Sequence, residues 1–294
     1  MRTLMTGATG FIGRRLASVL VENGHKVQAV VRAQTDLARL VPGVVPHLHD
    51  GGMESLRSIL TETKPDIVVH LAARCQDRHF PSDIEHLIKD NITFGAMLLE
   101  AMAQTGTRHL VNTSTSWQHF QGRAYSPTCL YAATKQAFEA LLRYYSDTQG
   151  LNVLTLKLFD TYGPQDPRGK LVSLFLRMLR DGSSLDMSPG EQLIDLMHVD
   201  DVVSAYMVAM ERLMSGLAPG EESYAVSSGI HIQLRDLAAL FSDRAGAPLH
   251  INWGARPYRE REVMTPWSTG VSLPGWRPRI GLGEGLSRLI AEDV

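Results

Sequence analysis

Short apolar runs, rich in β-branched residues, alternate in the first half of the chain with longer stretches whose apolar positions recur at helical spacing. This alternation is typical of β-α-β units, in which crossover helices join parallel strands. The apolar runs predict strands at residues 3–5, 26–31, 66–71, 109–113 and 153–159. The periodic stretches predict helices at residues 11–22, 53–63, 84–105 and 131–148. We therefore expect an α/β fold with a doubly wound parallel sheet.

The pattern changes after Tyr162, where glycine and proline interrupt the chain often and predict shorter elements separated by turns. We expect residues 1–165 to form the parallel-sheet domain, to which the chain returns near residues 190–210. Residues 166–294 are expected to form mainly a smaller C-terminal α/β lobe.

A glycine-rich turn follows the first predicted strand and precedes the first predicted helix. Gly7 permits a tight turn, Gly10 leaves room for phosphates, and Gly13 lets the helix pack closely on the strand. The N–H groups that begin the helix then favour a pyrophosphate. The turn therefore predicts a dinucleotide-binding site. Three neighbours are expected to line it: Thr9, Phe11 and Ile12.

The end of the second predicted strand indicates which dinucleotide binds. A carboxylate there bonds the ribose 2′-hydroxyl of NAD, whereas an arginine pairs with the 2′-phosphate of NADP. The strand runs into Arg32 and has no acidic residue at its end. The sequence thus favours NADP(H). NAD(H) stays open as the alternative, because Arg32 is also compatible with an ordinary solvated side chain.

A tyrosine and a lysine four residues apart stand on one face of a predicted helix. A nearby ammonium favours the ionised form of a phenol, so Lys135 would bring Tyr131 toward the pKa range useful for proton transfer. The strand before this helix ends in a run of hydroxyl side chains, at the sheet edge where doubly wound folds bind ligands. We predict that Ser114 polarises a substrate carbonyl, with Thr115 as the alternative.

Composition narrows the class of partner. The 294 residues carry a formal net charge of −2, which provides no field to attract nucleic acid or an anionic membrane. The two cysteines, Cys75 and Cys129, have no metal-binding spacing, so we expect no metal site and no disulfide. Without an apolar run long enough to span a bilayer or a signal segment, the sequence predicts a cytoplasmic protein with a small-molecule partner.

Several motifs occur in order along nearly the whole chain: residues 6–13, Asp50, residues 70–73, Asn91, Ser114, Tyr131 with Lys135, and residues 162–164. Together they resemble the NAD-dependent epimerase/dehydratase family of extended short-chain dehydrogenases. The resemblance implies a Rossmann domain, a smaller lobe for a nucleoside-diphosphate sugar and an active site between the two. It also implies a homodimer, formed through the helices at residues 84–105 and 131–148.

The resemblance further implies roles for individual residues. The cofactor is expected to contact Asp50, Gly51, Leu71, Ala72, Ala73, Asn91, Tyr131, Lys135 and Phe159, besides the glycine turn and Arg32. The substrate is expected to contact Arg74, Ser114, Thr115, Ser116, Asp160, Lys170, Arg256 and Arg259.

The reaction is less sharply indicated than the family. Dehydratases of the family have an Asp-Glu pair after the active-site hydroxyl, and this chain has Thr115-Ser116 there. Residues 156–170, 187–192 and 198–202 are similar to CDP-abequose and CDP-paratose synthases, which reduce a C4 ketone. We therefore expect NADPH-dependent reduction of a nucleotide-linked 4-keto-6-deoxyhexose. A 4-epimerase that retains NAD and a non-catalytic dinucleotide sensor are the alternatives.

Three positions depart from the family pattern. Ile194 replaces an arginine that pairs with the substrate diphosphate, and Lys157 and Asp160 replace an arginine and an asparagine. A bound diphosphate needs cationic or N–H partners, so other lysines or arginines are candidates for the missing charge, and each of them is also compatible with an ordinary surface side chain. The candidates are Lys170, Arg256, Arg259 and Arg261.

Overall fold

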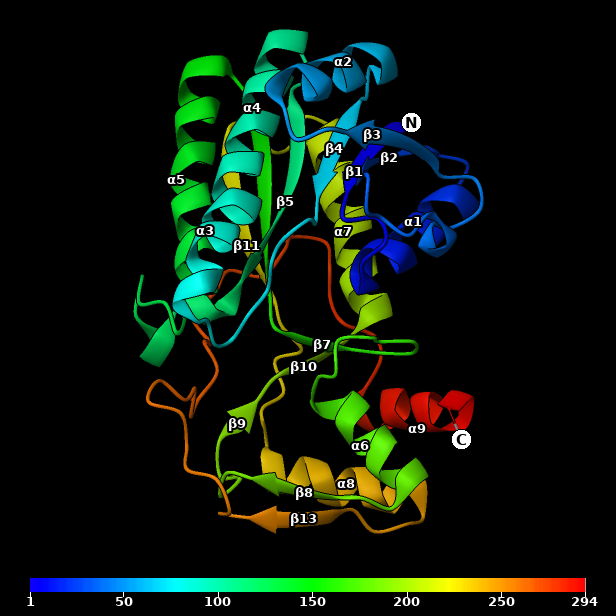
Figure 1. Cartoon of the computed structure of the whole chain (residues 1–294), viewed down its shortest axis with the longest axis vertical. Helices are drawn as coiled ribbons and strands as arrows, with labels where there is room; N and C mark the ends of the chain where they lie inside the picture. Colours follow the sequence, from blue (N-terminus) through cyan, green and yellow to red (C-terminus); the bar gives the residue numbers. More distant parts are fainter. Residues whose placement is uncertain (294) are drawn as a thin grey trace.

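The computed structural model describes residues 1–293 and contains a seven-stranded sheet in which all neighbouring strands are parallel (Figure 1). The strand order is β11-β6-β5-β4-β1-β2-β3. The strands are β1 Arg2–Thr6, β2 Lys26–Arg32, β3 Val45–His49, β4 Ile67–His70, β5 His109–Thr115, β6 Asn152–Leu158 and β11 Glu221–Val226. The order reverses beside β1, so the crevice at the carboxyl ends of β1 and β4 is where such a sheet binds ligands.

Helices cover both faces of the sheet, which explains why the central strands are almost continuously apolar. The helices α1 (Phe11–Glu22) and α7 (Val199–Met214) pack against one face. The other face is covered by α2 (Met53–Thr63), α4 (Phe94–Thr105) and α5 (Leu130–Gln149). The predicted α/β doubly wound fold is confirmed, and two predicted helix ranges coincide with α1 and α2.

Two local features differ from the prediction. The sequence analysis placed no strand at β3, because this edge strand is largely exposed and lacks a clear apolar alternation. The helix predicted at residues 84–105 is divided into α3 (Ile84–Ile88), a π-helical turn (Lys89–Thr93) and α4. Such turns bulge a helix locally, and here the bulge carries Asp90 and Asn91 toward the carboxyl edge of the sheet.

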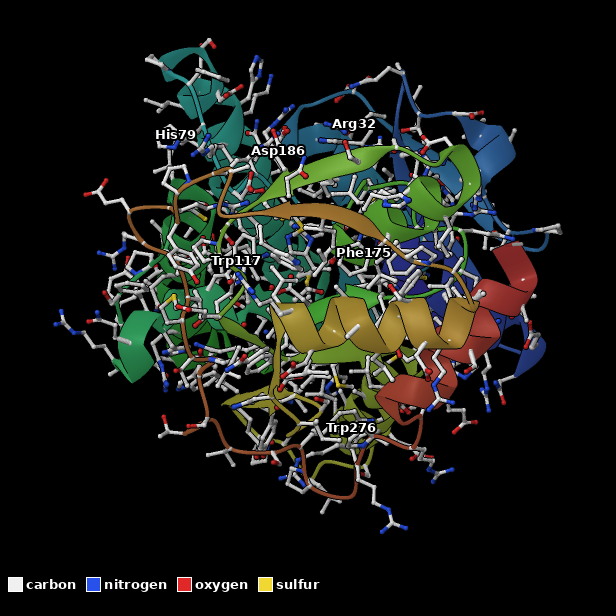
Figure 2. The ribbon with its side chains drawn as sticks, turned by 90° about the horizontal axis from the view of Figure 1, so that it is seen from below. Arg32, His79, Trp117, Phe175, Asp186 and Trp276 are labelled. Atoms are coloured by element: carbon white, nitrogen blue, oxygen red, sulfur yellow. The ribbon has the colours of Figure 1, made fainter. Side chains whose placement is uncertain are left out.

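The smaller lobe lies below the carboxyl edge of the sheet in Figure 1. Its helices are α6 Leu171–Asp181, α8 Leu234–Ala245 and α9 Leu282–Asp293. Its short strands are β7 Asp160–Tyr162, β8 Ser184–Met187, β9 Leu193–Ile194, β10 Leu196–His198, β12 Ile232–Gln233 and β13 His250–Trp253. Phe175, labelled in Figure 2, belongs to the apolar core of this lobe. Its ring centroid lies 5.4 Å from that of Phe241.

The chain passes between the two lobes several times. It returns to the sheet domain through α7 and β11, so the return reaches Val226 and is longer than residues 190–210. It then crosses back into the smaller lobe through β12 and α8. Trp276, which precedes α9, donates a hydrogen bond of 2.8 Å to Ser204 on α7. The smaller lobe is thus assembled from separated stretches of chain and tied to the sheet domain.

Candidate active site

The glycine turn has the geometry that its sequence requires. Gly7 has φ +74°, and a Cβ there would lie 2.7 Å from the backbone nitrogen of Ala72. A Cβ on Gly13 would lie 2.1 Å from the carbonyl oxygen of Gly7. Both positions therefore require glycine because backbone approaches backbone.

The start of α1 fits a pyrophosphate. Gly10 is the N-cap residue of α1, and no side chain caps the helix. The first N–H groups of the helix are therefore available to bind an anion, and the helix dipole favours negative charge at this end. Arg168, which the sequence analysis did not single out, places its guanidinium 4.4 Å above the Phe11 ring at this helix end. The residues present thus fit a dinucleotide.

Arg32 stands at the end of β2, but tertiary structure gives it an acidic neighbour that the sequence analysis missed. The Nη1 atom of Arg32, whose side chain is 60% exposed, lies 3.7 Å from Oδ1 of Asp90. The other carboxylate oxygen of Asp90 accepts a 2.9 Å bond from Nε of Arg74. An aspartate thus lies beside the strand end, although none follows the strand in sequence.

Other predicted cofactor residues gather at the same edge of the sheet. Asp50 follows β3 and accepts a bond from the Gly52 nitrogen, which lowers the pKa of its carboxyl. Gly51 is exposed with φ +98°. Leu71, Ala72 and Ala73 follow β4, and Phe159 follows β6.

Asn91 has a supporting position. It is 1% exposed, and its amide bonds both the nitrogen and the oxygen of Arg74, at 2.7 and 3.0 Å, and the Thr134 hydroxyl at 2.9 Å. Both ends of the Asn91 amide are therefore engaged by the protein, and the residue holds the segment after β4 against α5.

Tyr131 and Lys135 lie one turn apart near the start of α5, and both are buried. Burial, together with the neighbouring Cys75 and Cys129, raises the pKa of Tyr131 well above 10, in contrast to the lowered pKa expected from the sequence. Burial also lowers the pKa of Lys135 to about 8, against the opposing effect of Glu139. Tyr131 thus stays protonated at neutral pH, which suits a proton donor.

The structure does not support Ser114 as the group that polarises a carbonyl. Ser114 is 2% exposed, and its hydroxyl donates to the carboxylate of Glu139 and lies 3.1 Å from Oε1 of Gln118. A serine hydroxyl has one hydrogen to donate, and here that hydrogen is used inside the protein. Thr115 accepts a 3.2 Å bond from the Trp117 nitrogen, which leaves its own hydrogen for another acceptor. The geometry therefore favours Thr115.

The predicted substrate residues are only partly brought together. Lys170 places its ammonium 5.0 Å from the centroid of the Trp117 ring, and Trp117 packs edge-on against Tyr131. Burial raises the pKa of Asp160, with Lys170 opposing that rise. Lys170 and Asp160 thus lie near Tyr131, and Ser116 is half-buried at the end of β5.

The other candidate cations are used differently. Arg259 forms a 2.7 Å ion pair with Asp77. Arg261 donates to the Ser126 hydroxyl at 2.7 Å and lies over the Phe120 ring, so the segment after β13 contacts the sheet domain. Arg256 has an exposed side chain on the same segment.

Both cysteines lie near Tyr131, although they are far apart in sequence. Cys75 lies close enough to influence the pKa of the phenol, and Cys129 is the N-cap residue of α5, two residues before Tyr131. Both are free thiols. The spacing of the two cysteines in the sequence did not indicate that both lie near Tyr131.

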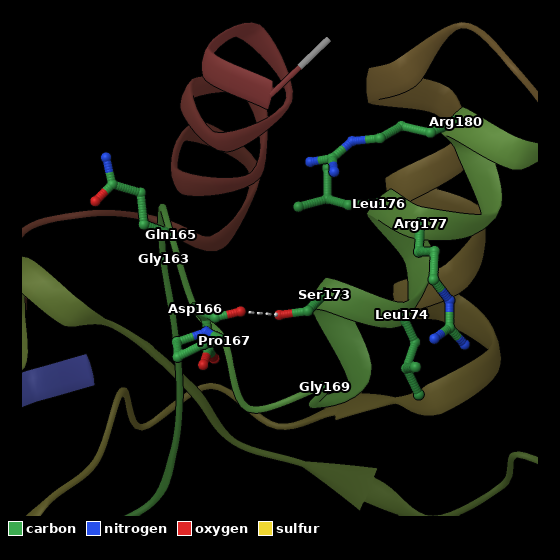
Figure 3. Close-up of a pocket in the computed structure, with 10 residues that line it drawn as sticks. All are labelled: Gly163, Gln165, Asp166, Pro167, Gly169, Ser173, Leu174, Leu176, Arg177 and Arg180. Carbon is green, nitrogen blue, oxygen red and sulfur yellow. Dashed lines mark hydrogen bonds between the residues drawn. The ribbon is translucent and has the colours of Figure 1, made fainter. Parts of the chain in front are cut away.

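A separate cavity of about 460 Å³ lies between the loop after β7 and α6 (Figure 3). Gln165, Ser173 and Arg177 line it, and none of the predicted site residues does. Among residues 1–293, no cluster of three or more potential ligand side chains is arranged to hold a metal ion. Within the same residues, no helix has the length and apolar character needed to cross a membrane.

Comparison with known proteins identifies the family. Residues 3–226 match the model of the NAD dependent epimerase/dehydratase family. The chain is 24% identical to CDP-abequose synthase from Salmonella muenchen, over 99% of this chain and 97% of that protein. The chain therefore belongs to the NAD-dependent epimerase/dehydratase family and is an enzyme of the extended short-chain dehydrogenase type.

Solved structures agree with this assignment. The fold superimposes on UDP-glucose 4-epimerase from Thermotoga maritima, determined with UDP-glucose, with a TM-score of 0.88 and 25% identity over 99% of this chain and 98% of that chain. It also superimposes on the Thermus thermophilus UDP-glucose 4-epimerase complex with NAD, with a TM-score of 0.83 and 26% identity over 100% and 99% of the two chains.

Proposed function

We propose that this enzyme reduces the C4 ketone of a nucleotide-linked 4-keto-6-deoxyhexose with NADPH. The observation that carries the proposal is the buried Tyr131, which lies one turn from Lys135 and packs against Trp117, just after the hydroxyl-bearing end of β5. The relative that makes CDP-abequose supports the same class of substrate. A dehydratase is disfavoured because Ser116 and Trp117 follow the Thr115 hydroxyl, where an acid and a base would be needed.

The proposed mechanism assigns one task to each side chain. When bound, the nicotinamide supplies hydride to the ketone carbon. Thr115 donates a hydrogen bond to the carbonyl oxygen, and Tyr131 gives its proton to the alkoxide that forms. Lys135 stabilises the phenolate left on Tyr131 and holds the nicotinamide ribose. Lys170 supplies positive charge for the substrate diphosphate in place of the arginine that Ile194 replaces.

The direct test is turnover of a CDP-linked 4-keto-6-deoxyhexose with NADPH, followed by loss of absorbance at the nicotinamide band. Stoichiometric NADPH oxidation with formation of the 4-hydroxy sugar is expected. Interconversion of 4-hydroxy epimers without added cofactor would instead identify the epimerase. That second candidate is favoured by the carboxylate of Asp90 beside β2 and by the related epimerase that contains NAD. Absence of turnover with every sugar tested would revive the dinucleotide sensor.

Arg32 and Asp90 are expected to control cofactor choice in opposite directions. Arg32→Ala should weaken NADPH binding by about 10- to 100-fold, because it removes a charge-assisted bond to the 2′-phosphate, and should leave NADH binding nearly unchanged. Asp90→Asn should strengthen NADPH binding, because it removes a negative charge close to that phosphate. Fluorescence titration with both cofactors measures these effects. Equal losses for NADPH and NADH in Arg32→Ala would contradict the assignment.

Thr115 and Ser114 can be separated by substitution. Thr115→Val removes the hydroxyl with little change in shape and is expected to lower kcat about 100-fold, because the carbonyl oxygen loses a donor. Ser114→Ala should lower kcat less, with a loss of thermal stability, because its hydroxyl bonds Glu139. Steady-state kinetics and melting curves of the two variants provide the comparison. The reverse ranking in kcat would restore Ser114 as the polarising group.

We also propose that the enzyme is a homodimer paired through α3, α4 and α5. Ile84, Ile88 and Tyr144 on these helices are exposed apolar or aromatic side chains, which suits an interface between two copies. A mass of one chain by light scattering would contradict this proposal.

A further inference from the structure

Glu139 is a buried carboxylate on the same face of α5 as the catalytic pair. It follows Lys135 by four residues and Tyr131 by eight, so the three side chains form one row along the helix. Its side chain is 10% exposed, and a carboxylate at that depth requires specific partners. The mechanism above gives Glu139 no task.

Glu139 joins three elements of the sheet domain. One carboxylate oxygen accepts from the Ser114 hydroxyl at the end of β5 and from Nε2 of Gln118, at 2.9 Å, in the turn that follows. The other oxygen lies 3.2 Å from Nζ of Lys157 on β6. Ser114 directly precedes Thr115. The bond from Ser114 to the Glu139 carboxylate therefore fixes the position of the end of β5, and with it Thr115, relative to α5.

The same network reaches the smaller lobe. The Lys157 ammonium, itself 9% exposed, lies 3.1 Å from Nε2 of His119. The His119 ring stacks on Trp267 with a centroid separation of 3.8 Å, and Trp267 belongs to the segment between β13 and α9. Lys157 therefore balances the charge of Glu139 and links it to the segment that contacts the sheet domain.

The charged groups around this face come from several elements. On α5 itself, Lys135 lies next to Glu139, and burial is the main influence on the Lys135 pKa. His70 on β4 faces Lys135, and its pKa is lowered to about 3, so it stays neutral at neutral pH. Glu221 on β11 also influences this region and is paired with Arg143 at 2.8 Å. In the row of Tyr131, Lys135 and Glu139 along α5, the negative charge is thus the carboxylate of Glu139.

We infer that Glu139 is a positioning residue for the reaction: it sets Thr115 against Tyr131 through Ser114, and its charge stabilises the Lys135 ammonium. The inference rests on the proposed function for its kinetic test. Lys157 acts with it, because a buried carboxylate that loses its cation would be left unpaired. Lys157→Arg should preserve activity. Lys157→Met should lower kcat as Glu139→Gln does, but it should not move the alkaline limb to lower pH, because the carboxylate charge remains.

The test compares two ion-paired carboxylates of the sheet domain. Glu139→Gln is expected to lower kcat at least about tenfold with little change in the KM of either substrate, because the reacting groups are misplaced. Activity should also be lost at lower pH as pH rises, because Lys135 loses its proton more easily without the neighbouring charge. Glu222→Gln, whose parent side chain is 23% exposed and ion-paired with Arg212 on α7, is the control and should move neither value.

A second variant separates charge from geometry. Glu139→Asp keeps the charge but is one methylene too short to hold Ser114 and Lys157 together, so kcat should fall while the alkaline limb stays in place. If Glu139→Gln and Glu222→Gln change kcat and the pH profile alike, or if Glu139→Gln lowers only the melting temperature, the inference is wrong.

A readout without substrate distinguishes this inference from the proposed function. Protein labelled with ¹³C at lysine Cε can be titrated by NMR, and the Lys135 signal is assigned by its loss in Lys135→Met. Its midpoint should fall in Glu139→Gln and stay in place in Glu222→Gln. A wild-type enzyme without turnover on the ketone would refute only the proposed function. A Lys135 midpoint that does not move in Glu139→Gln would refute the inference.

Discussion

Tyr131→Phe is expected to lower kcat by about 10³-fold, because proton transfer by a positioned side chain contributes a factor of this order and phenylalanine has no proton to give. Dinucleotide binding should stay within about twofold of wild type, since the ring remains and the glycine turn is untouched. The rate of hydride transfer from NADPH to the nucleotide-linked 4-keto-6-deoxyhexose, followed by stopped flow, measures the first effect. Fluorescence titration of the cofactor measures the second.

A control on the same helix makes this result specific. Tyr145→Phe also removes a phenol oxygen from α5, but that hydroxyl donates to Glu100 at 2.8 Å and lies away from the site. It should leave kcat unchanged and lower the free energy of unfolding by about 1 kcal/mol, the usual cost of a lost hydrogen bond. If Tyr131→Phe retained most of its activity, Tyr131 would not be the proton donor.

Gly13→Ala is expected to abolish dinucleotide binding, with a loss of at least about 100-fold, and to destabilise the protein by about 1 to 3 kcal/mol. The new methyl group would lie 2.1 Å from the Gly7 oxygen, so the turn and the start of α1 must separate. The N–H groups that begin the helix would then no longer face the pyrophosphate. Cofactor titration and chemical denaturation measure the two effects.

Two other glycines provide the matched comparison. At Gly10 a Cβ would meet only the Gly7 oxygen at 3.2 Å, so Gly10→Ala should keep the fold and weaken binding because the methyl occupies the approach of the phosphates. Gly24 has φ +75° and nothing within 4 Å of a Cβ, so Gly24→Ala should cost about 1 to 2 kcal/mol and leave binding intact. Unchanged cofactor affinity in Gly13→Ala would place the dinucleotide elsewhere.

Much of the sheet domain was predictable from local sequence. Strands covered on both faces appear as apolar runs, and amphipathic helices appear as a helical period, so the ranges of α1 and α2 were predicted correctly. The edge strand β3 was missed because most of its side chains face solvent and carry no such pattern. The glycine turn was recognisable because Gly7 and Gly13 are close in sequence, and the close approach of their backbones leaves no room for a side chain.

The choice between two adjacent hydroxyls depended on residues distant in sequence. Ser114 and Thr115 have similar chemistry and neighbouring positions, so sequence reasoning alone could not rank them securely. Glu139, which is 25 residues from Ser114, engages the Ser114 hydroxyl and leaves Thr115 available. The pKa of Tyr131 likewise depended on burial, and spacing from Lys135 by itself pointed in the opposite direction.

The sequence by itself determined the α/β fold and the dinucleotide turn, because these depend on periodicity and on contacts between residues close along the chain, and its ordered motifs carried the resemblance to the family. Only the tertiary structure placed Asp90 beside Arg32, Cys75 beside Tyr131 and Glu139 beneath Ser114. Electrostatic interactions and hydrogen bonds act across space, and the crossover topology brings together side chains whose separation in sequence contains no trace of that proximity.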